Sequence, residues 1–287
     1  GPKSHYSKAG TPTMGGIAFI MAIAIVLMGI TLWYAFANKQ GELIPMALTM
    51  ALAVMNGMIG FVDDYKKLVK KQNEGLSAKQ KFLLQLVAAI AYVVLLKLVG
   101  HVNTTLHIPF TEINVELGIV YYIFSVILIV GIVNSVNLTD GLDGLASTVT
   151  LVVSVFFAAV ALTTLNASLS LISAVVIGAM LGFLIYNHHP AKVFMGDTGS
   201  LFLGGAVVGS AFLINEPMII FIAGGVFVFE TVTVMLQVFS YKTFHKRIFK
   251  CSPFHHHLEQ CGWSEVKIVS VFSIITALLC TVAWFGI

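Results

Sequence analysis

The sequence predicts an all-α, polytopic integral membrane protein, on the basis of two observations. Of its 287 residues, 58% are hydrophobic and only 10% are charged, whereas soluble domains carry about 25% charged residues. The hydrophobic residues also form runs long enough to cross a bilayer, which takes about 20 mostly apolar residues. The runs and their loops use the whole chain, so we expect one transmembrane helical domain over residues 1–287, with catalytic loops at its surface.

Nine apolar runs are predicted to be transmembrane helices, each bounded by a polar or glycine-containing loop. In chain order they are residues 17–37, 44–62, 81–99, 118–136, 145–164, 169–186, 200–215, 217–241 and 266–286. An odd number of crossings places the two ends of the chain on opposite sides of the membrane. The three cysteines, Cys251, Cys261 and Cys280, form no paired framework, so no disulfide is expected.

Lysine and arginine residues indicate the cytoplasmic side, because they favour the cytoplasmic ends of membrane helices. Of the sixteen, only Lys39 and Lys97 fall on one side, and fourteen fall on the other. Those fourteen are Lys3, Lys8, Lys66, Lys67, Lys70, Lys71, Lys79, Lys81, Lys192, Lys242, Lys246, Arg247, Lys250 and Lys267. Their side is therefore predicted to be cytoplasmic, with Ile287 outside.

All five aspartates fall on the predicted cytoplasmic side, at or near helix ends. They are Asp63, Asp64, Asp140, Asp143 and Asp197. The glutamates are not sorted in this way, because four of them fall outside: Glu42, Glu112, Glu116 and Glu216. The aspartates therefore do not follow a general bias of acidic residues, and we expect the chemistry at the cytoplasmic face.

The first candidate motif is the pair Asp63 and Asp64, which follows the second span and precedes Lys66 and Lys67. Adjacent carboxylates repel each other and tend to share a cation or a proton. The alternative is a solvated helix end with anchoring lysines, which is common at membrane surfaces.

The second motif is a dense polar run directly after the fourth span. It comprises Asn134, Asn137, Thr139, Asp140, Gly141, Leu142, Asp143 and Gly144. Glycines allow the backbone to approach a ligand closely. A tight turn is the alternative, but a turn needs one Asp-Gly pair, and here two occur three residues apart, which favours a functional loop.

The third motif surrounds Asp197, between Phe194 and Ser200, and follows Asn187 and two histidines. Thr198 and Ser200 are candidate helix caps, and a helix N-terminus attracts anions through its free N–H groups and its dipole. Asp197 beside a bound phosphate would suit Mg²⁺, which is held by one or two carboxylates plus substrate phosphates. The alternative is that Asp197 is only an N-cap.

The fourth motif is the triplet His255, His256 and His257 in a basic loop. Three consecutive histidines cannot all face one point of a regular helix. Flanking Cys251 and Cys261 raise the alternative of zinc, although the spacing fits no familiar zinc pattern. A solvated basic loop is a further alternative, and anion binding is the interpretation that we favour.

Weaker signals come from the glycine- and threonine-rich opening loop with Lys8 and Thr13, and from Lys79 and Lys81. Phosphate contacts and interfacial anchoring of the lysines both fit. Glu230 lies inside a predicted span, where an ionisable residue is either functional or bonded between helices. Together the motifs predict Mg²⁺ with a phosphorylated substrate at one membrane face, and a lipidic second substrate from the bilayer.

Five motifs then resemble one family of enzymes along essentially the whole chain. They are Gly1–Gly16, Asp63-Asp64, Asn137–Gly144, Phe194–Ser200 and Pro253–His257. They are similar to the phospho-N-acetylmuramoyl-pentapeptide transferases (MraY) of bacterial peptidoglycan synthesis. The triple histidine favours this family over the related polyprenyl-phosphate N-acetylglucosamine-1-phosphate transferases, which remain the alternative. A cation transporter is a third candidate, but polar residues stay at one face apart from Glu230 and Gln237, which counts against a path across the membrane.

The resemblance implies a reaction and its partners. Phospho-MurNAc-pentapeptide moves from UDP-MurNAc-pentapeptide to undecaprenyl phosphate with Mg²⁺, giving lipid I and UMP, and the enzyme is a homodimer. The site lies at the cytoplasmic face of the bacterial plasma membrane, and no nucleic acid partner is expected. The family has ten transmembrane helices, so we expect that the first is missing from this sequence.

The resemblance also implies roles for individual residues. Asp197 resembles the Mg²⁺ ligand, and the implied catalytic residues are Asp63, Asp64, Asp197 and His255. The implied substrate-binding residues are Lys8, Thr13, Lys79, Asn137, Asp140, Gly141, Leu142, Asn187, Phe194, His256 and His257. A lipid monophosphate is mostly dianionic at neutral pH, since its second pKa is about 6, so we favour direct attack on the β-phosphate over a covalent intermediate on Asp63 or Asp64.

Overall fold

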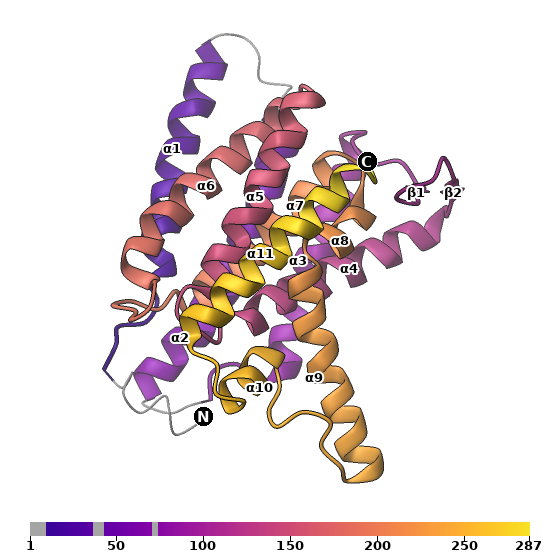
Figure 1. The fold of residues 1–287 in the computed structure, drawn as a ribbon. Helices are drawn as coiled ribbons and strands as arrows, with labels where there is room; N and C mark the ends of the chain where they lie inside the picture. Colours follow the sequence, from indigo (N-terminus) through magenta and orange to yellow (C-terminus); the bar gives the residue numbers. More distant parts are fainter. Residues whose placement is uncertain (1–9, 37–42, 71–73) are drawn as a thin grey trace.

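The computed structural model describes residues 10–36, 43–70 and 74–287, and these form a bundle of long helices (Figure 1). The long helices are α1 (Gly16–Phe36), α2 (Ile44–Lys70), α3 (Ala78–Leu98), α4 (Ile119–Thr139), α5 (Leu145–Thr163), α6 (Ala167–Asn187), α7 (Gly196–Leu213), α9 (Gly225–Phe244) and α11 (Glu265–Trp284). The short elements are the strands β1 (Thr105–His107) and β2 (Asn114–Glu116), the 3-10 helix η3 (Pro217–Ile219), and the helices α8 (Ile220–Ala223) and α10 (Phe254–Gln260). The predicted helical membrane fold is confirmed.

Seven helices in the described part of the chain are long and apolar enough to cross a membrane, or up to eight spans if the bent pair around Gly224 is one span. The seven are α1, α2, α3, α4, α5, α6 and α11. They coincide with seven of the predicted runs. The count of nine is not confirmed, because the predicted spans 200–215 and 217–241 take other forms.

The predicted span 200–215 corresponds to α7, which is the central helix of the bundle. Every residue from Thr198 to Leu213 is buried. A Cβ at Gly204 would lie 2.7 Å from the Cα of Val133 in α4, and one at Gly205 would lie 2.8 Å from the Cα of Ala53 in α2. Small residues allow membrane helices to approach this closely. Since its neighbours enclose α7, its small and apolar residues face other helices and not lipid.

The predicted span 217–241 is not one straight helix. The chain bends by 80° between Pro217–Ala223 and Gly225–Phe244. Gly224 lies at the bend, and its N–H still donates to the carbonyl oxygen of Ile220 over 2.9 Å. Beyond the bend, α9 leaves the bundle and projects past its lower end in Figure 1. The bend therefore brings the first half of α9 beside the short helix α10.

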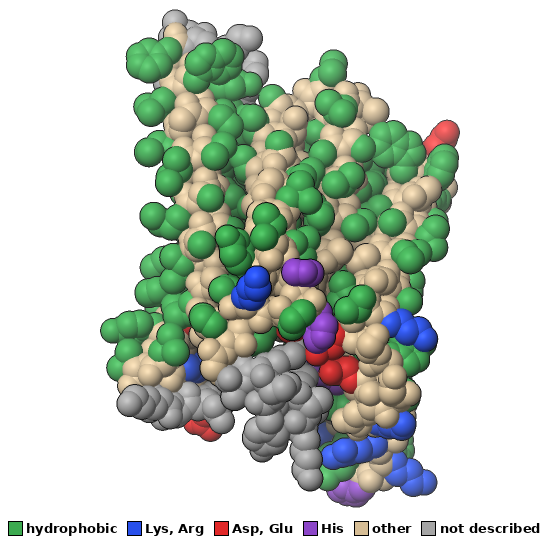
Figure 2. Space-filling view, turned by 60° about the vertical axis from the view of Figure 1, so that its left-hand side comes forward, with side chains coloured by type: hydrophobic (Ala, Val, Ile, Leu, Met, Phe, Trp, Pro, Cys, Tyr) green, Lys and Arg blue, Asp and Glu red, His purple; other side chains and the backbone are tan. Residues whose placement is uncertain are grey.

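The two ends of the bundle differ in polarity. At the upper end in Figure 1, β1 and β2 form a small antiparallel hairpin near the C-terminus, and His107 Nδ1 ties it to the Glu216 carboxylate at 2.9 Å. At the lower end, charged and histidine side chains gather, and hydrophobic side chains cover most of the remaining face (Figure 2). This is the surface expected of a multi-pass membrane protein with a polar site at one face.

Candidate active site

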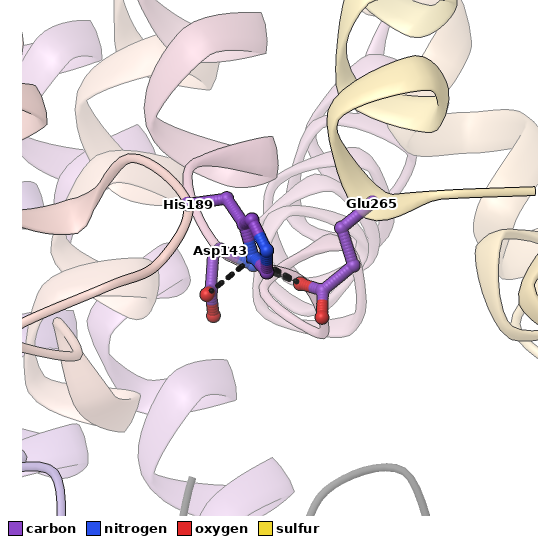
Figure 3. Close-up of side chains that lie close together, drawn as sticks. All are labelled: Asp143, His189 and Glu265. Carbon is purple, nitrogen blue, oxygen red and sulfur yellow. Dashed lines mark hydrogen bonds and ion pairs between the residues drawn. The ribbon is translucent and has the colours of Figure 1, made fainter. Parts of the chain in front are cut away.

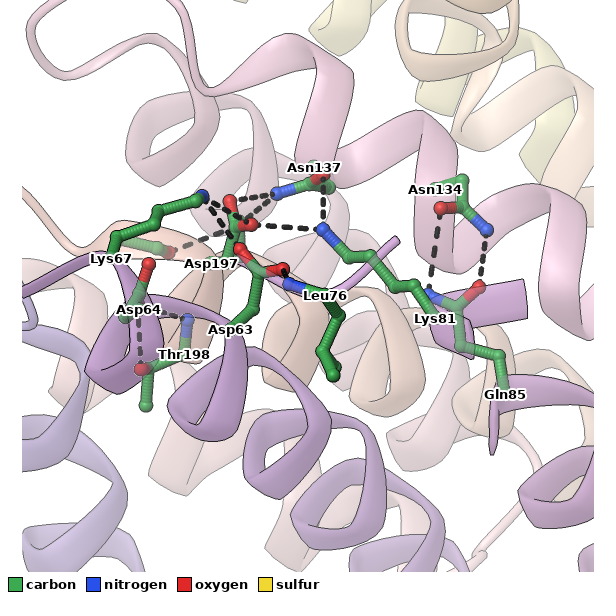
Figure 4. Close-up of polar contacts among 12 residues, drawn as sticks. Asp63, Asp64, Lys67, Leu76, Lys81, Gln85, Asn134, Asn137, Asp197 and Thr198 are labelled. Atoms are coloured by element: carbon green, nitrogen blue, oxygen red, sulfur yellow. Dashed lines mark hydrogen bonds and ion pairs between the residues drawn. The ribbon is translucent and has the colours of Figure 1, made fainter. Parts of the chain in front are cut away.

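Three aspartates meet at the lower end of the bundle, where α2 packs on α7. Asp63 and Asp64 lie near the C-terminal end of α2, and Asp197 lies in the first turn of α7. Gly60 permits the contact, since a Cβ there would lie 2.1 Å from the carbonyl oxygen of Asp197. One carboxylate oxygen from each aspartate falls within 4.8 Å of the others, and Figure 4 shows the three carboxylates converging.

Two lysines compensate the charge of this aspartate group. Lys67, one turn after Asp63 on α2, places its Nζ 2.6 Å from Asp63 and 3.1 Å from Asp197. Lys81 comes from the first turn of α3, and its Nζ lies 2.9 Å from the same oxygen of Asp197. Burial alone would raise the pKa of the Asp197 carboxyl, but the charges of the two lysines hold that pKa below its ordinary value.

Neutral partners fix each of the three carboxylates separately (Figure 4). Asp64 Oδ2 accepts from the backbone N–H of Thr198 at 2.9 Å and from its hydroxyl at 2.8 Å. Asp63 Oδ1 accepts from the N–H of Leu76, in the loop before α3, at 2.7 Å. Asp197 Oδ1 accepts from the side-chain amide of Asn137 at 2.9 Å. The three acids therefore keep fixed positions despite their mutual repulsion.

The aspartate group suits a hard cation. Mg²⁺ prefers oxygen ligands and is held by one or two carboxylates together with substrate phosphates, and all three side chains here are carboxylates. The two lysines that now neutralise the group are flexible and partly exposed, since Lys67 is 36% and Lys81 17% exposed. They can move aside or turn to a phosphate when a cation enters.

Two clefts meet at the aspartate group. The first has a volume of about 490 Å³ and is lined by Thr13, Asp64, Lys67, Leu68, Asn137, Asp140, Gly141, Leu142, Asp143, Phe194, Gly196 and Asp197. The second has a volume of about 800 Å³ and is lined by Asp63, Lys66, Lys67, Glu74, Gly75, Leu76, Ser77, Ala78, Gln80, Lys81 and Asp197. Lys67 and Asp197 line both. Asp64 faces only the first cleft and Asp63 only the second, so the two neighbours serve different spaces.

The first cleft contains most of the residues predicted to bind substrate. Thr13, Asn137, Gly141, Leu142 and Phe194 all line it. Asp140 lines it too, and burial together with neighbouring carboxylates raises the pKa of Asp140 well above its ordinary value.

Three predicted binding residues lie elsewhere or outside the described residues. Asn187 is 2% exposed; it accepts from the Ser147 hydroxyl at 2.7 Å and donates to the Val193 carbonyl at 2.9 Å, so it supports the loop that carries Phe194. Lys79 is exposed on the first turn of α3, and Lys81 is the lysine of that turn that reaches Asp197. Lys8 lies outside the described residues.

The three histidines have three different surroundings. His255 is fully buried, and its Nδ1 lies 3.3 Å from the Glu230 carboxylate. His256 Nδ1 lies 2.6 Å from Glu259, and His257 Nδ1 accepts from the N–H of Lys250 at 3.1 Å. Among the described residues, neither group of three possible metal ligands includes a cysteine, so the zinc alternative gains no support there.

A second group, Asp143 and Glu265 with His189 between them, is shown in Figure 3, and its Asp143 lines the first cleft. Asp143 Oδ2 accepts from the N–H of Ala191 at 3.0 Å and lies 3.0 Å from His189 Nδ1. Glu265, at the start of α11, lies 3.8 Å from the same nitrogen and accepts from the N–H of Asp143 at 3.2 Å. The group joins the loop after α4, the loop after α6 and α11, and so braces the cleft.

Sequence reasoning omitted five residues of these groups from the predicted site: Lys67, Lys81, Asp143, His189 and Glu265. Lys67 had a readable signal, because residues four apart on a helix lie on one face, and Asp63 is four positions earlier. Lys81 was noted only beside Lys79. His189 and Glu265 are 76 positions apart in the sequence, and no local pattern connects them.

Comparisons with known proteins agree with the motifs. A family model described as Glycosyl transferase family 4 matches residues 46–215, and one described as Phospho-N-acetylmuramoyl-pentapeptide-transferase signature 1 matches residues 8–20. The chain is 45% identical over 289 residues to the phospho-N-acetylmuramoyl-pentapeptide-transferase of Clostridium botulinum (strain Eklund 17B / Type B), covering 100% of this chain and 86% of that protein. It is 44% identical over 290 residues to the protein of the same name from Staphylococcus carnosus (strain TM300), covering 100% and 88%.

Proposed function

Because this chain belongs to the phospho-N-acetylmuramoyl-pentapeptide transferases, we propose that it transfers phospho-MurNAc-pentapeptide from UDP-MurNAc-pentapeptide to undecaprenyl phosphate at its two clefts, giving lipid I and UMP. Transfer of phospho-MurNAc-pentapeptide to a lipid carrier in peptidoglycan synthesis follows from the family. We propose in addition that the donor is UDP-MurNAc-pentapeptide, that the acceptor is undecaprenyl phosphate, that Mg²⁺ is required, and that individual residues have the roles given below. A homodimer in the bacterial plasma membrane, with the site facing the cytoplasm, belongs to the same proposal.

The observation that carries the proposal is the position of Asp197 between two clefts. A transferase needs two binding spaces that share one reacting centre, and Asp197 and Lys67 line both clefts. A carboxylate group with two lysines also fits the chemistry of a diphosphate, whose charge is neutralised by cations in phosphoryl transfer. The gathering of polar groups at one end of an apolar bundle fits a substrate that arrives in the bilayer.

We assign the donor to the first cleft. The Phe194 ring supplies an aromatic surface for the uracil, and the loop Asp140–Leu142 supplies polar groups and backbone close to it. Asp197, with Asp64 beside it in this cleft, would hold Mg²⁺, which when bound neutralises charge on the diphosphate oxygens. Lys67 would contact the phosphates, since its ammonium lies between the two clefts.

We assign the acceptor phosphate to the second cleft, beside Asp63 and Lys81. Lys81 would hold the dianionic lipid phosphate, and Asp63 would orient it or accept its residual proton. An oxygen of that phosphate attacks the β-phosphorus of the donor, a new P–O–P bond forms, and the bond to UMP breaks. Asp64 Oδ2 already accepts two hydrogen bonds from Thr198, which makes it a poorer nucleophile and supports direct attack over a covalent intermediate on Asp64.

Replacing Asp197 tests the proposal most directly. Asp197→Ala should lower the rate of lipid I formation from UDP-MurNAc-pentapeptide and undecaprenyl phosphate by at least about 10³-fold at every Mg²⁺ concentration, because several kcal/mol of transition-state stabilisation are removed. Glu112→Gln, at the opposite end of the bundle, is the control and should retain full activity. Lipid I formation by Asp197→Ala at the wild-type rate would overturn the metal assignment.

A further inference from the structure

Glu230 is a buried carboxylate of α9 for which the proposed reaction has no use. Its side chain is 0% exposed, although α9 is one arm of the bent membrane segment. Its two oxygens accept from the backbone of the next helix: Oε2 from the N–H of Phe254 at 2.6 Å, and Oε1 from the N–H of His255 at 3.1 Å. Because these N–H groups open α10 and have no partner within it, Glu230 anchors α10 to α9.

The same carboxylate also faces the His255 ring. His255 Nδ1 lies 3.3 Å from Glu230 Oε2, and both side chains are fully buried. Within the described residues neither ring nitrogen of His255 makes a hydrogen bond, so the approach of Nδ1 to Glu230 is an electrostatic contact, and Nε2 has no polar partner at all. A buried polar atom without a partner is costly and rare in native structures, so this nitrogen is a candidate to meet a group that the protein alone does not supply.

The Nε2 end of the ring points at the cleft loop. A Cβ built on Gly141 would lie 2.1 Å from His255 Nε2 and 2.9 Å from its Cε1. Position 141 therefore requires glycine because the ring occupies the space of a side chain. Gly141 lines the first cleft, between Asp140 and Leu142. A contact chain thus runs from Glu230 through His255 to the loop assigned to the donor.

We propose that Glu230 is a positioning residue, which anchors α10 and orients His255 so that its Nε2 supports the Gly141 loop and meets the bound donor. Glu230 touches no reacting atom in this proposal. Its effect passes through His255, whose ring must keep both its place against Gly141 and its direction. The inference rests on the proposed function for its kinetic part, but the contact chain itself is independent of it.

The kinetic test compares Glu230→Gln with Thr233→Val, a buried control one turn further along α9 whose hydroxyl donates to the backbone carbonyl of residue 230 and not to its carboxylate. Glu230→Gln should lower kcat for lipid I formation by about 10²-fold, the loss typical of a small misplacement in an active site. The KM for the lipid acceptor should change less than about threefold, since the second cleft is untouched. Glu230→Asp should recover part of kcat, and Thr233→Val should leave it unchanged.

Equal losses in Glu230→Gln and Thr233→Val, or a loss that follows only the fraction of folded protein, would overturn the positioning role. Failure of the proposed function is recognised separately, because the wild-type chain would then form no lipid I.

A second measurement needs no activity. Gly141→Ala pushes on the ring from the opposite end, and Gly182→Ala, where a Cβ meets nothing within 4 Å, is its control. If His255 connects the two positions, the double variant should lose clearly less melting temperature than the sum of the losses measured for Glu230→Gln and Gly141→Ala alone. Additive losses would show that the contact chain does not exist, and would overturn the proposal even in an inactive preparation.

Discussion

Two acidic groups lie at the same end of the molecule and differ in how their charge is compensated. Asp63, Asp64 and Asp197 form the first, and Asp143, His189 and Glu265 form the second, each with three possible ligand atoms within 4.8 Å. In the first, lysine side chains from α2 and α3 reach in from the clefts. In the second, an imidazole and backbone N–H groups fill the space between the acids.

This difference indicates that the first group is a site whose partners can exchange, whereas the second group holds loops in place. A lysine ammonium on a flexible stem can turn to a phosphate when a cation takes its place. A backbone N–H cannot move without moving its loop, so Asp143 stays bonded to Ala191 as long as the loop after α6 keeps its position. The first group also opens onto two clefts, whereas only Asp143 of the second group lines one.

The largest expected effect in this comparison comes from Lys81, one of the two lysines that distinguish the first group. Lys81→Met should lower lipid I formation by about 10²–10³-fold, because it removes a preorganised positive charge from a phosphoryl-transfer site. Lys79→Met is the matched control, two residues earlier on the same helix turn and exposed. Lys79→Met should lower the rate of lipid I formation by less than about fivefold, because an exposed charge at the membrane surface contributes little. Steady-state rates with both substrates measure the contrast.

Equal losses in the two lysine variants would show that Lys81 contributes only general charge, as any lysine at the membrane surface does. A large loss in Lys79→Met alone would return the phosphate contact to the residue that the sequence resemblance favours.

An intermediate effect is expected from Asn137, which fixes Asp197 without carrying charge. Asn137→Leu removes the amide donor to Asp197 and to the Ser200 hydroxyl. Loss of such a support for a metal ligand should cost about 10–10²-fold and raise the Mg²⁺ concentration needed for half-maximal rate. Asn134→Leu, which instead breaks a bond to Gln85, should leave the Mg²⁺ requirement unchanged. A shifted Mg²⁺ requirement in both variants would contradict the role given to Asn137.

The sequence predicted the aspartate group better than it predicted the helices around it. Lysine distribution and helix ends placed Asp63, Asp64 and Asp197 at one face, and α2 and α7 do bring them together. The glycines of α7 were not recognised as packing surface, because an enclosed helix and a lipid-facing helix are both apolar. The 80° bend was missed because the two glycines between the apolar runs, Gly224 and Gly225, do not fix the direction of the second run.

Contacts between distant segments escaped the sequence for a different reason. Asn137 was predicted to bind substrate, but in the structure its amide also orients Asp197, and no motif separates these two roles. Glu230 was noted as an intramembrane acid, yet its partners at Phe254 and His255 depend on the bend that brings α9 to α10. Tertiary packing decides such pairings, and spacing along the chain does not record it.

The smallest effect is expected in the second group, and it tests the comparison from the other side. His189→Leu removes a partly exposed imidazole, 40% exposed, from Asp143, while the N–H of Ala191 continues to hold that carboxylate. Such a contact contributes about 0–1 kcal/mol, so the melting temperature should fall by no more than about 1–3 °C. Activity should stay within about threefold of the wild type, with an unchanged Mg²⁺ requirement.

If His189→Leu instead abolished activity or altered the Mg²⁺ requirement as Asn137→Leu does, the second group would be part of the reacting centre, and the distinction between brace and site would fail. If it altered neither rate nor stability, Asp143 would be held by backbone alone, which would place the brace in the N–H groups of the loops rather than in the imidazole.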